Sequence, residues 1–454
     1  MLLLALIAVL GTIFLDLYYQ MKNKSNLHPG PKGLPIVGNI MDLPPKGLPE
    51  YQHWLKFKDT YGPISSVTDV ESRRFLLRIL EDPAYLIAHI KTETGAIILQ
   101  IVYGYSIEPQ TADPLVLLTE CMMHNLSVAL LPMYWAVDIF PILKYIPEGL
   151  PGAVFERVAR KWNEINRMVI DIPYTFVQQQ MANGSQRPSY VASSIEQHGR
   201  MNEDEEEAIK ETAALMYPGG VDTTVSSVSS FILAMMLFPS VQRKAQAEID
   251  SIIGGGRLPQ FEDREKLPYV NALIKETVRW LPVVSLGVTH ITDEEINYKG
   301  VRIPKGAYLL PMVWWFLHDP QVYPNHSSFD PERFLKPRNE PDPATEAFGY
   351  GRSICPGRFL ADENLFLTIS RLLTVFDITK AADENGKEIE PEIDITPGII
   401  SHPLRFPYCI KASSTQSVDI IRSVEKDHPW KKGDAHLLNG SLNGSLFSRL
   451  WSRE

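Results

Sequence analysis

One cysteine of the chain lies in a glycine-rich loop that could hold a metal-containing cofactor. Cys355 stands within Phe348–Arg358, which reads Phe-Gly-Tyr-Gly-Arg-Ser-Ile-Cys-Pro-Gly-Arg. Because glycine has no side chain, such a loop can pass close to a flat ligand while its N–H groups converge on the sulfur. A thiolate there could ligate haem iron and favour O–O cleavage. The alternative is a structural cysteine, the interpretation given to Cys121 and Cys409, which lack surrounding glycines.

A second group of residues places an acid beside two alcohols in a long helical segment. The helix is predicted from Asn202, whose side chain can cap it, to about Phe238. Its middle reads Pro-Gly-Gly-Val-Asp-Thr-Thr, and Gly costs helix stability by about 1 kcal/mol and Pro by about 3 kcal/mol. We therefore expect a break there, beside a functional groove. A hydroxyl next to a carboxylate can relay protons through water, so Asp222 and Thr223 are candidate catalytic residues. The alternative is a kink in which the threonine bonds back to the helix.

Both stretches resemble those of the cytochrome P450 family. The haem-binding loop of that family has the pattern Phe-x-x-Gly-x-Arg-x-Cys-x-Gly, which Phe348, Gly351, Cys355 and Gly357 match. Its oxygen-binding helix has Gly-Gly-x-Asp-Thr-Thr, as here. The resemblance implies a mainly α-helical fold with a smaller β region around a b-type haem. It also implies that Cys355 is the axial ligand of the iron and that the acid and alcohol pair delivers protons.

The chain departs from the family pattern where the haem propionates would bind. Ser353 stands where the family usually has arginine or histidine, and a serine carries no charge. His290 occupies a place where members often put a basic residue against a propionate, although a core or surface histidine is the alternative. After the strand predicted for Ile64–Thr68, the family has further strands and the B and C helices, with propionate-binding Trp and Arg. This chain continues directly into the helical pattern of Asp69–Leu80, so the fold is expected to be incomplete after the first strand.

A charged network is expected on the side of the fold that carries the haem loop. Glu276 and Arg279 are three residues apart on a predicted helix and can pair. Pro-Glu-Arg-Phe at Pro331–Phe334 resembles the family's second arginine site. The resemblance implies that Arg333 completes a buried network with a structural role.

The β region and the substrate pocket are also predicted from the chain that follows. Apolar or alternating runs predict strands at Val283–His290, Ile296–Ile303 and Tyr308–Trp314. Asp394–Pro407 resembles the terminal hairpin that points apolar residues into the family's substrate pocket. The candidate pocket walls are Tyr217, Val283, Val284, Leu286, Ile399 and Ile400.

Composition and the two ends of the chain constrain its location. The chain has 454 residues and a net charge of −10, which argues against a nucleic-acid partner. Its three cysteines have no paired spacing, which favours a reducing compartment. Residues 1–20 are predicted to be a transmembrane anchor followed by lysines, with a cleaved signal peptide as the alternative. Residues 21–48 are predicted to be a proline-rich hinge and entry segment, 49–412 the catalytic domain, and 413–454 a polar, disordered tail.

The resemblance implies a haem-thiolate monooxygenase that takes electrons from NADPH through a cytochrome P450 reductase. One atom of O2 would enter a small lipophilic substrate, and the overall style resembles fungal enzymes of secondary metabolism at the endoplasmic reticulum membrane. Two alternatives stay open. The first is a truncated, haem-poor remnant without activity, because propionate partners are missing. The second is a thiolate-haem isomerase or dehydratase that uses no reductase, which the acid and alcohol pair disfavours.

Overall fold

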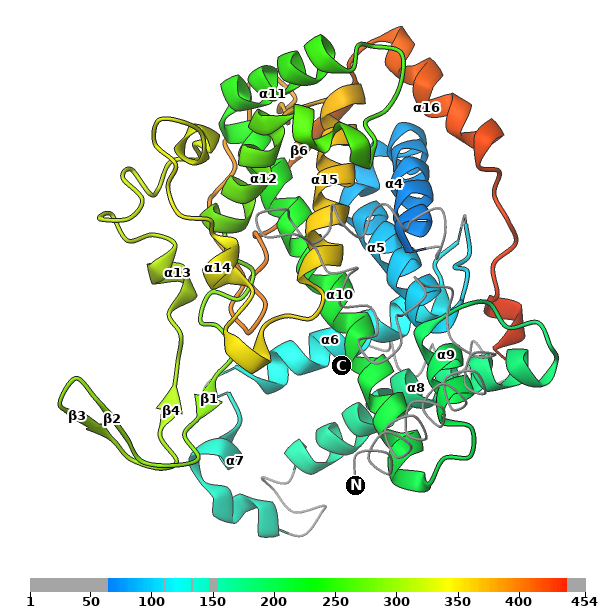
Figure 1. The fold of residues 1–454 in the computed structure, drawn as a ribbon, viewed down its shortest axis with the longest axis vertical. Helices are drawn as coiled ribbons and strands as arrows, with labels where there is room; N and C mark the ends of the chain where they lie inside the picture. Colours follow the sequence, from blue (N-terminus) through cyan, green and yellow to red (C-terminus); the bar gives the residue numbers. More distant parts are fainter. Residues whose placement is uncertain (1–63, 110, 132–133, 147–153, 439–454) are drawn as a thin grey trace, which may run out of the picture.

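One long helix, α10 (Glu203–Leu237), passes through the middle of the molecule, and other helices pack around it (Figure 1). The structure is a computed structural model that describes residues 64–109, 111–131, 134–146 and 154–438. The predicted transmembrane anchor and proline-rich hinge lie outside the described residues. Within the described residues the fold is mainly α-helical, with short antiparallel strands, as the sequence predicts.

The other elements follow in chain order. The α-helices are α4 (Ile64–Glu81), α5 (Leu86–Tyr103), α6 (Pro114–Ala129), α7 (Ala136–Ile139), α8 (Val154–Ala182), α9 (Tyr190–His198), α11 (Pro239–Ile252), α12 (Pro268–Trp280), α13 (Val313–Phe316), α14 (Ala344–Ala347), α15 (Arg358–Val375) and α16 (Thr415–Asp427). The 3-10 turns are η2 (Pro83–Tyr85), η3 (Pro141–Tyr145), η4 (Phe261–Lys266), η5 (Pro331–Phe334), η6 (Gly351–Ser353) and η7 (Ala435–Leu437). The strands are β1 (His290–Ile291), β2 (Ile296–Tyr298), β3 (Val301–Ile303), β4 (Tyr308–Leu309), β5 (Phe376–Lys380) and β6 (Tyr408–Ala412).

Helix α10 begins where the sequence predicts it, but its predicted central break is absent. Asn202 and Glu205 form a reciprocal capping box at its start. The helix then continues through Pro218, and every residue from 224 to 236 is buried. Packing explains why the helix persists: α10 approaches α5 so closely that a Cβ on Gly220 would lie 2.7 Å from a side-chain atom of Ile98. Tertiary contacts therefore outweigh the low helix propensity of this stretch.

The strand predicted for Ile64–Thr68 is wrong, because these residues form the start of α4. Thr68, Ser72 and Phe75 are completely buried and recur at helical spacing, so they share the face of α4 that meets α5 and α15. The Ser72 hydroxyl also donates to the Thr68 carbonyl at 2.7 Å. Burial of this helical face therefore outweighs the preference of the β-branched residues for a strand, and the segment is helical.

The strands predicted between 283 and 314 are largely replaced by turns. In Val283–His290 only the last residue is in a strand, because Gly287 turns the chain with a φ of +62°. Ile296–Ile303 is a hairpin rather than one strand, since Lys299 and Gly300 both have positive φ values, as in a type I′ turn. Tyr308–Trp314 begins as β4 and ends in α13.

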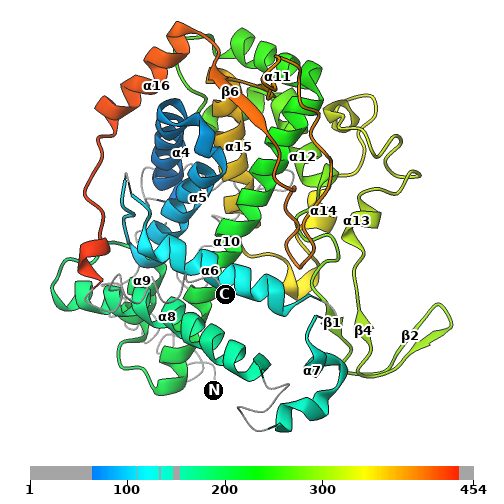
Figure 2. The ribbon, with the colours of Figure 1, turned by 180° about the vertical axis from the view of Figure 1, so that it is seen from behind.

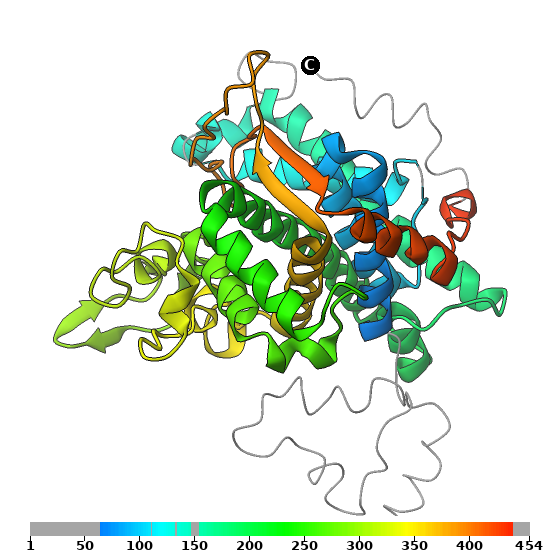
Figure 3. The same ribbon diagram turned by 90° about the horizontal axis from the view of Figure 1, so that it is seen from above.

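The chain between β5 and β6 brings a distant segment to the middle of α10. The two strands pair in antiparallel register, Phe376 opposite Ala412, and lie over one end of the helices (Figure 3). The connection between them descends beside α10 (Figure 2) and contains a narrow hairpin, with a bridge from Ile395 to Pro403. A hairpin is predicted from the sequence at Asp394–Pro407, and the structure has one there.

Within the described residues 413–438, the tail predicted to be disordered contains a helix that packs on the core. Ser414 caps α16, whose Ile421 and Val424 are buried against the core. Beyond it, the ring of Trp430 lies 4.9 Å from the Arg78 guanidinium, and Asp434 pairs with Arg187. The tail is polar overall, but a single apolar stripe on a capped helix is enough to dock it.

Candidate functional site

The loop that carries Cys355 leaves the cysteine sulfur free for a ligand. The Cys355 N–H donates to the Phe348 carbonyl at 2.8 Å, which closes the loop just before α15 begins. Gly349 and Gly351 have φ values of +77° and +58°, a region that side chains disfavour, so the glycines are needed for this shape. Among the described residues, no group forms a hydrogen bond or a disulfide with the Cys355 Sγ, which is partly exposed.

The surroundings of the sulfur fit the thiolate side of a haem. A Cβ on Gly357 would lie 3.9 Å from Sγ, and one on Gly351 would meet no atom within 4 Å, so open space lies along the loop. Ile354 and Phe359, which flank the cysteine, keep 37% and 39% of their surface exposed. Apolar side chains left exposed beside an unpaired thiol are the lining that a large flat ligand would cover.

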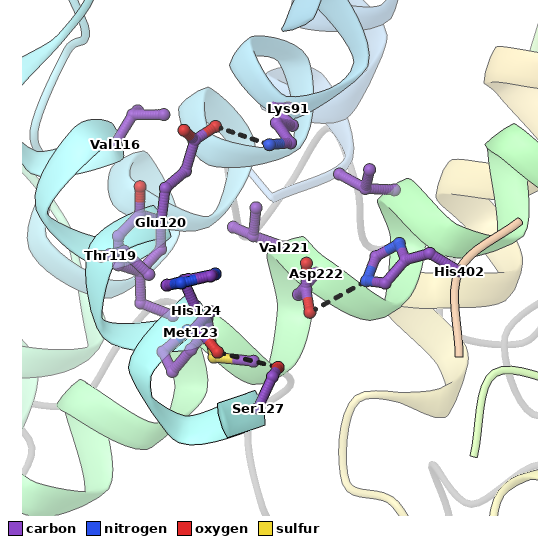
Figure 4. Close-up of a pocket in the computed structure, with 13 residues that line it drawn as sticks. Lys91, Val116, Thr119, Glu120, Met123, His124, Ser127, Val221, Asp222 and His402 are labelled. Atoms are coloured by element: carbon purple, nitrogen blue, oxygen red, sulfur yellow. Dashed lines mark hydrogen bonds and ion pairs between the residues drawn. The ribbon is translucent and has the colours of Figure 1, made fainter. Parts of the chain in front are cut away.

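A cavity of about 190 Å³ lies between α5, α6, α10 and the terminal hairpin (Figure 4). Tyr217, Val221 and Asp222 line it from α10, while His402 reaches it from the hairpin. The opposite wall is polar, because Lys91 of α5 pairs there with a carboxylate of α6 at 3.0 Å. The remaining lining residues are Val116, Thr119, Glu120, Met123, His124, Ser127, Pro218 and Val225.

The two candidate catalytic residues have different surroundings. The Asp222 carboxylate faces the cavity and lies 3.2 Å from the His402 Nε2 (Figure 4). The Thr223 hydroxyl donates to the Gly219 carbonyl at 2.7 Å, which is the back-bonded arrangement that the sequence leaves open. Its oxygen can still accept a hydrogen bond. Asp222 is therefore the member of the pair that lines this cavity.

Comparison with known proteins decides the family. A family model described as Cytochrome P450 matches residues 82–410, well over half of the chain. The chain belongs to the cytochrome P450 family. It is 45% identical to a cytochrome P450 monooxygenase, CLM2, of Gibberella zeae, over 97% of this chain and 99% of that protein. It is 39% identical to the multifunctional cytochrome P450 monooxygenase af510 of Aspergillus fumigatus, over 92% and 94% of the two chains. An O-methylsterigmatocystin oxidoreductase of Aspergillus flavus is 36% identical over 94% and 96%.

Alignments with these relatives contain positions that no residue of this P450 fills. The alignment with the Gibberella zeae protein has 525 positions, but 97% of this 454-residue chain is only about 440 residues. About 85 positions of that alignment therefore have no residue from this chain. The Aspergillus flavus alignment, with 510 positions and 94% of this chain, leaves about as many unmatched. The matched family region begins at residue 82, downstream of the place where the sequence departs from the family pattern.

Membership makes this P450 an oxidoreductase, and the family implies a thiolate-ligated haem iron, a redox partner and a small-molecule substrate. Fungal members are commonly membrane-associated. Among the described residues, one helix, α10, is long and apolar enough to cross a membrane, but most of it is buried inside the fold.

A fully buried ionic network joins α12 to η5 in this P450. The Glu276 carboxylate accepts from the Arg279 Nε at 2.7 Å and from the Arg333 Nε at 3.1 Å. Burial raises the pKa of Glu276, while the two guanidinium groups oppose that shift. Arg333 also donates to Glu340 at 2.8 Å, and Arg279 to the Leu317 carbonyl at 2.9 Å. These contacts fix the segment that leads to α14 and the Cys355 loop.

Other predicted site residues lie away from the cavity. His290 is exposed in β1, opposite Leu309. Of the six candidate pocket walls, Tyr217 lines the cavity, and its buried hydroxyl has no hydrogen-bond partner among the described residues. The other five do not line this cavity: Leu286 is 52% exposed and Ile399 36%, and the remaining three, Val283, Val284 and Ile400, are partly exposed. Their contact with a substrate stays a prediction.

Sequence analysis missed His402 and the ion pair of the opposite wall. A signal for His402 exists, because residues two apart in a hairpin lie on one side of it, and the predicted pocket residue Ile400 is two positions earlier. Lys91 and Glu120 come from two helices that only the tertiary fold brings together, so no local pattern identifies them.

Proposed function

We propose that this P450 is a haem-thiolate monooxygenase that inserts one oxygen atom of O2 into a small lipophilic substrate. The observation that carries the proposal is the Cys355 sulfur, which has no partner among the described residues and lies in a glycine-shaped loop at the start of α15, within a chain that belongs to this family. Cys355 would hold the iron, and Phe348, Gly351 and Gly357 would shape the loop that lies against the haem. When bound, the haem supplies the oxygen chemistry.

The chain's own residues have three tasks in this proposal. Asp222 holds a proton at its carboxylate and releases it into the cavity, and the Thr223 hydroxyl accepts and passes on such a proton. The Glu276 network holds the frame of the Cys355 loop. His290 would approach a propionate from β1, where it is exposed and can reorient.

The cavity supports a lipophilic substrate with some polar character. Val116, Met123, Val221 and Val225 supply apolar surface, while the Tyr217 hydroxyl and the Lys91 pair supply polar groups. The A. flavus relative's name refers to O-methylsterigmatocystin, a compound of secondary metabolism. We infer a place in a fungal secondary-metabolite pathway for this chain as well.

NADPH, a cytochrome P450 reductase and the endoplasmic reticulum membrane complete the proposal. The family requires an electron donor, and a single N-terminal anchor at residues 1–20 would place the catalytic domain on the cytoplasmic side beside a membrane-bound reductase.

One observation favours a second candidate, a haem-poor remnant without activity. About 85 alignment positions of the relatives have no counterpart here. The family's B and C helices, with their propionate-binding residues, are predicted from the sequence to be missing, and we propose that these positions include them. Ser353 supplies no positive charge for a haem propionate, so the protein would retain the haem mainly through the Cys355 thiolate.

Haem content separates the two candidates. The full chain would be expressed with a haem precursor and its haem measured per polypeptide, beside Cys355→Ala and the matched control Cys409→Ala. The enzyme proposal predicts close to one haem per chain in the wild type and in the control, and a large loss in Cys355→Ala. A colourless wild-type protein would support the remnant. Reconstitution with NADPH, reductase and labelled O2, with O-methylsterigmatocystin as the probe, would then test oxygen insertion directly.

A further inference from the structure

Asp222 has a partner that the family pattern does not include. We propose that His402 is a positioning residue for Asp222: the two side chains share one proton, and His402 replaces it from solvent after Asp222 has released it into the cavity. The proposal rests on the proposed function and deepens it. The two groups are 3.2 Å apart, with 28% of the His402 side chain and 19% of the Asp222 side chain exposed. His402 is therefore the more accessible member of the pair.

The residue before His402 fixes the hairpin to two other elements. The Ser401 N–H donates to the Val283 carbonyl at 2.8 Å, and the Ser226 hydroxyl of α10 donates to the Ser401 carbonyl at 2.5 Å. The His402 N–H in turn donates to the Thr396 hydroxyl at 3.0 Å. These contacts hold the backbone at and next to His402. Its imidazole therefore lies over α10 at Asp222, one helical turn before Ser226. The pairing with Asp222 is thus a consequence of the hairpin's anchorage.

The other charged groups around the cavity do not compete for Asp222. Lys91 is paired with Glu120 on the opposite wall at 3.0 Å. His124 of α6 and the Tyr217 hydroxyl of α10 also line the cavity, but neither bonds to Asp222 in the described structure. A proton that moves from the His402 Nε2 to an Asp222 oxygen leaves a neutral imidazole and a neutral carboxyl. Release into the cavity restores the carboxylate, and a proton from solvent restores the imidazolium, so the cycle balances without any other reactant.

Nuclear magnetic resonance tests the pairing without turnover. With ¹⁵N-labelled histidine the full chain gives signals from eleven rings, and His402→Gln identifies the signal of interest. At pH 7 we expect Asp222→Asn to shift the ¹⁵N signals of the His402 ring, because the carboxylate 3.2 Å from its Nε2 is replaced by an uncharged amide. The His198 ring, which is exposed on α9, serves as the control and should not change. An unchanged His402 signal in Asp222→Asn would overturn the proposal.

Uncoupled turnover tests the role of the pair. The substrate-free protein with reductase would be assayed for hydrogen peroxide released per NADPH oxidised between pH 6 and pH 8. His402→Phe should change this ratio about tenfold, less than the 10²–10⁴-fold expected for losing the acid itself. His402→Gln, which keeps an N–H donor but cannot carry a proton, should change the ratio as His402→Phe does, and a ratio restored by glutamine would contradict the replacement of the proton by His402. In an Asp222→Asn background His402→Phe should add nothing.

The two proposals can fail separately. A protein without haem contradicts the proposed function, yet the histidine signals still decide whether His402 and Asp222 share a proton. A haem-loaded, active protein in which His402→Phe leaves both the peroxide ratio and its pH profile unchanged contradicts the positioning role alone. The variant His198→Gln controls for the loss of a histidine elsewhere on the surface.

Discussion

Replacing Glu93 with glutamine is expected to remove part of the pH dependence of folding stability. Glu93 lies on α5, completely buried, and accepts a hydrogen bond from the Thr368 hydroxyl of α15 at 2.8 Å. Its other carboxylate oxygen has no partner within the described chain. Burial raises the pKa of Glu93 from 4.5 to about 8, although the Thr368 hydrogen bond and the nearby Arg78 oppose the shift.

The sign follows from which state binds the proton. Between pH 4.5 and about pH 8 the folded protein keeps the Glu93 proton, whereas the unfolded chain releases it. Unfolding is therefore favoured as the pH rises through this window, and the stability that Glu93 contributes at low pH is lost. At about 1.4 kcal/mol per pKa unit, the loss from this one group between pH 5 and pH 7 is on the order of 2–3 kcal/mol.

Glutamine stays neutral at every pH and can still accept the Thr368 hydrogen bond. The assay is denaturant unfolding of the wild type, Glu93→Gln and the exposed control Glu384→Gln at several pH values from 5 to 7.5. Relative to the wild type, Glu93→Gln should gain stability as the pH rises, by about 2–3 kcal/mol over two pH units. The control should follow the wild type. Parallel pH curves for the wild type and Glu93→Gln would refute the assignment of a neutral buried carboxyl.

Two further substitutions test the frame around the site. Arg333→Met should destabilise the protein by about 3–5 kcal/mol, because it leaves its buried carboxylate partner with one cation fewer, while Arg302→Met, which breaks an exposed pair, should cost under about 1 kcal/mol in denaturant unfolding. An equal cost would contradict the buried network. Gly287→Ala should lower the melting temperature more than Gly306→Ala: both glycines have positive φ, but only at Gly287 would a Cβ lie 2.4 Å from Pro311. Equal melting temperatures would show that the turn can relax.

Local signals in the sequence are reliable where they agree with the packing. The capping box at Asn202 is predicted and present, because its hydrogen bonds are formed within four residues of chain. The Glu276 and Arg279 pair is likewise a contact within one helix. Where packing opposes the local signal, the prediction is wrong: Pro218 does not break α10, and Thr68 belongs to a helix.

Contacts between distant segments set the rest of the site. His402 is 180 positions from Asp222, and the hairpin reaches α10 only because Ser401 is tied to the Val283 carbonyl and to Ser226. Short apolar runs such as Tyr308–Trp314 suit a strand or a turn equally well until their neighbours are known. The family could be predicted from the motif around Cys355, whereas the pairing of Asp222 with His402 depends on the tertiary fold and could not.

The measurement that tests the central claim most directly is the carbon monoxide difference spectrum of the reduced full-length protein. If Cys355 ligates haem iron, the wild type and the control Cys121→Ala should both give the absorption band typical of a thiolate-ligated haem, and Cys355→His should lose that band while the polypeptide remains folded. A wild-type spectrum without this band, or a thiolate-type band that persists in Cys355→His, would contradict the account.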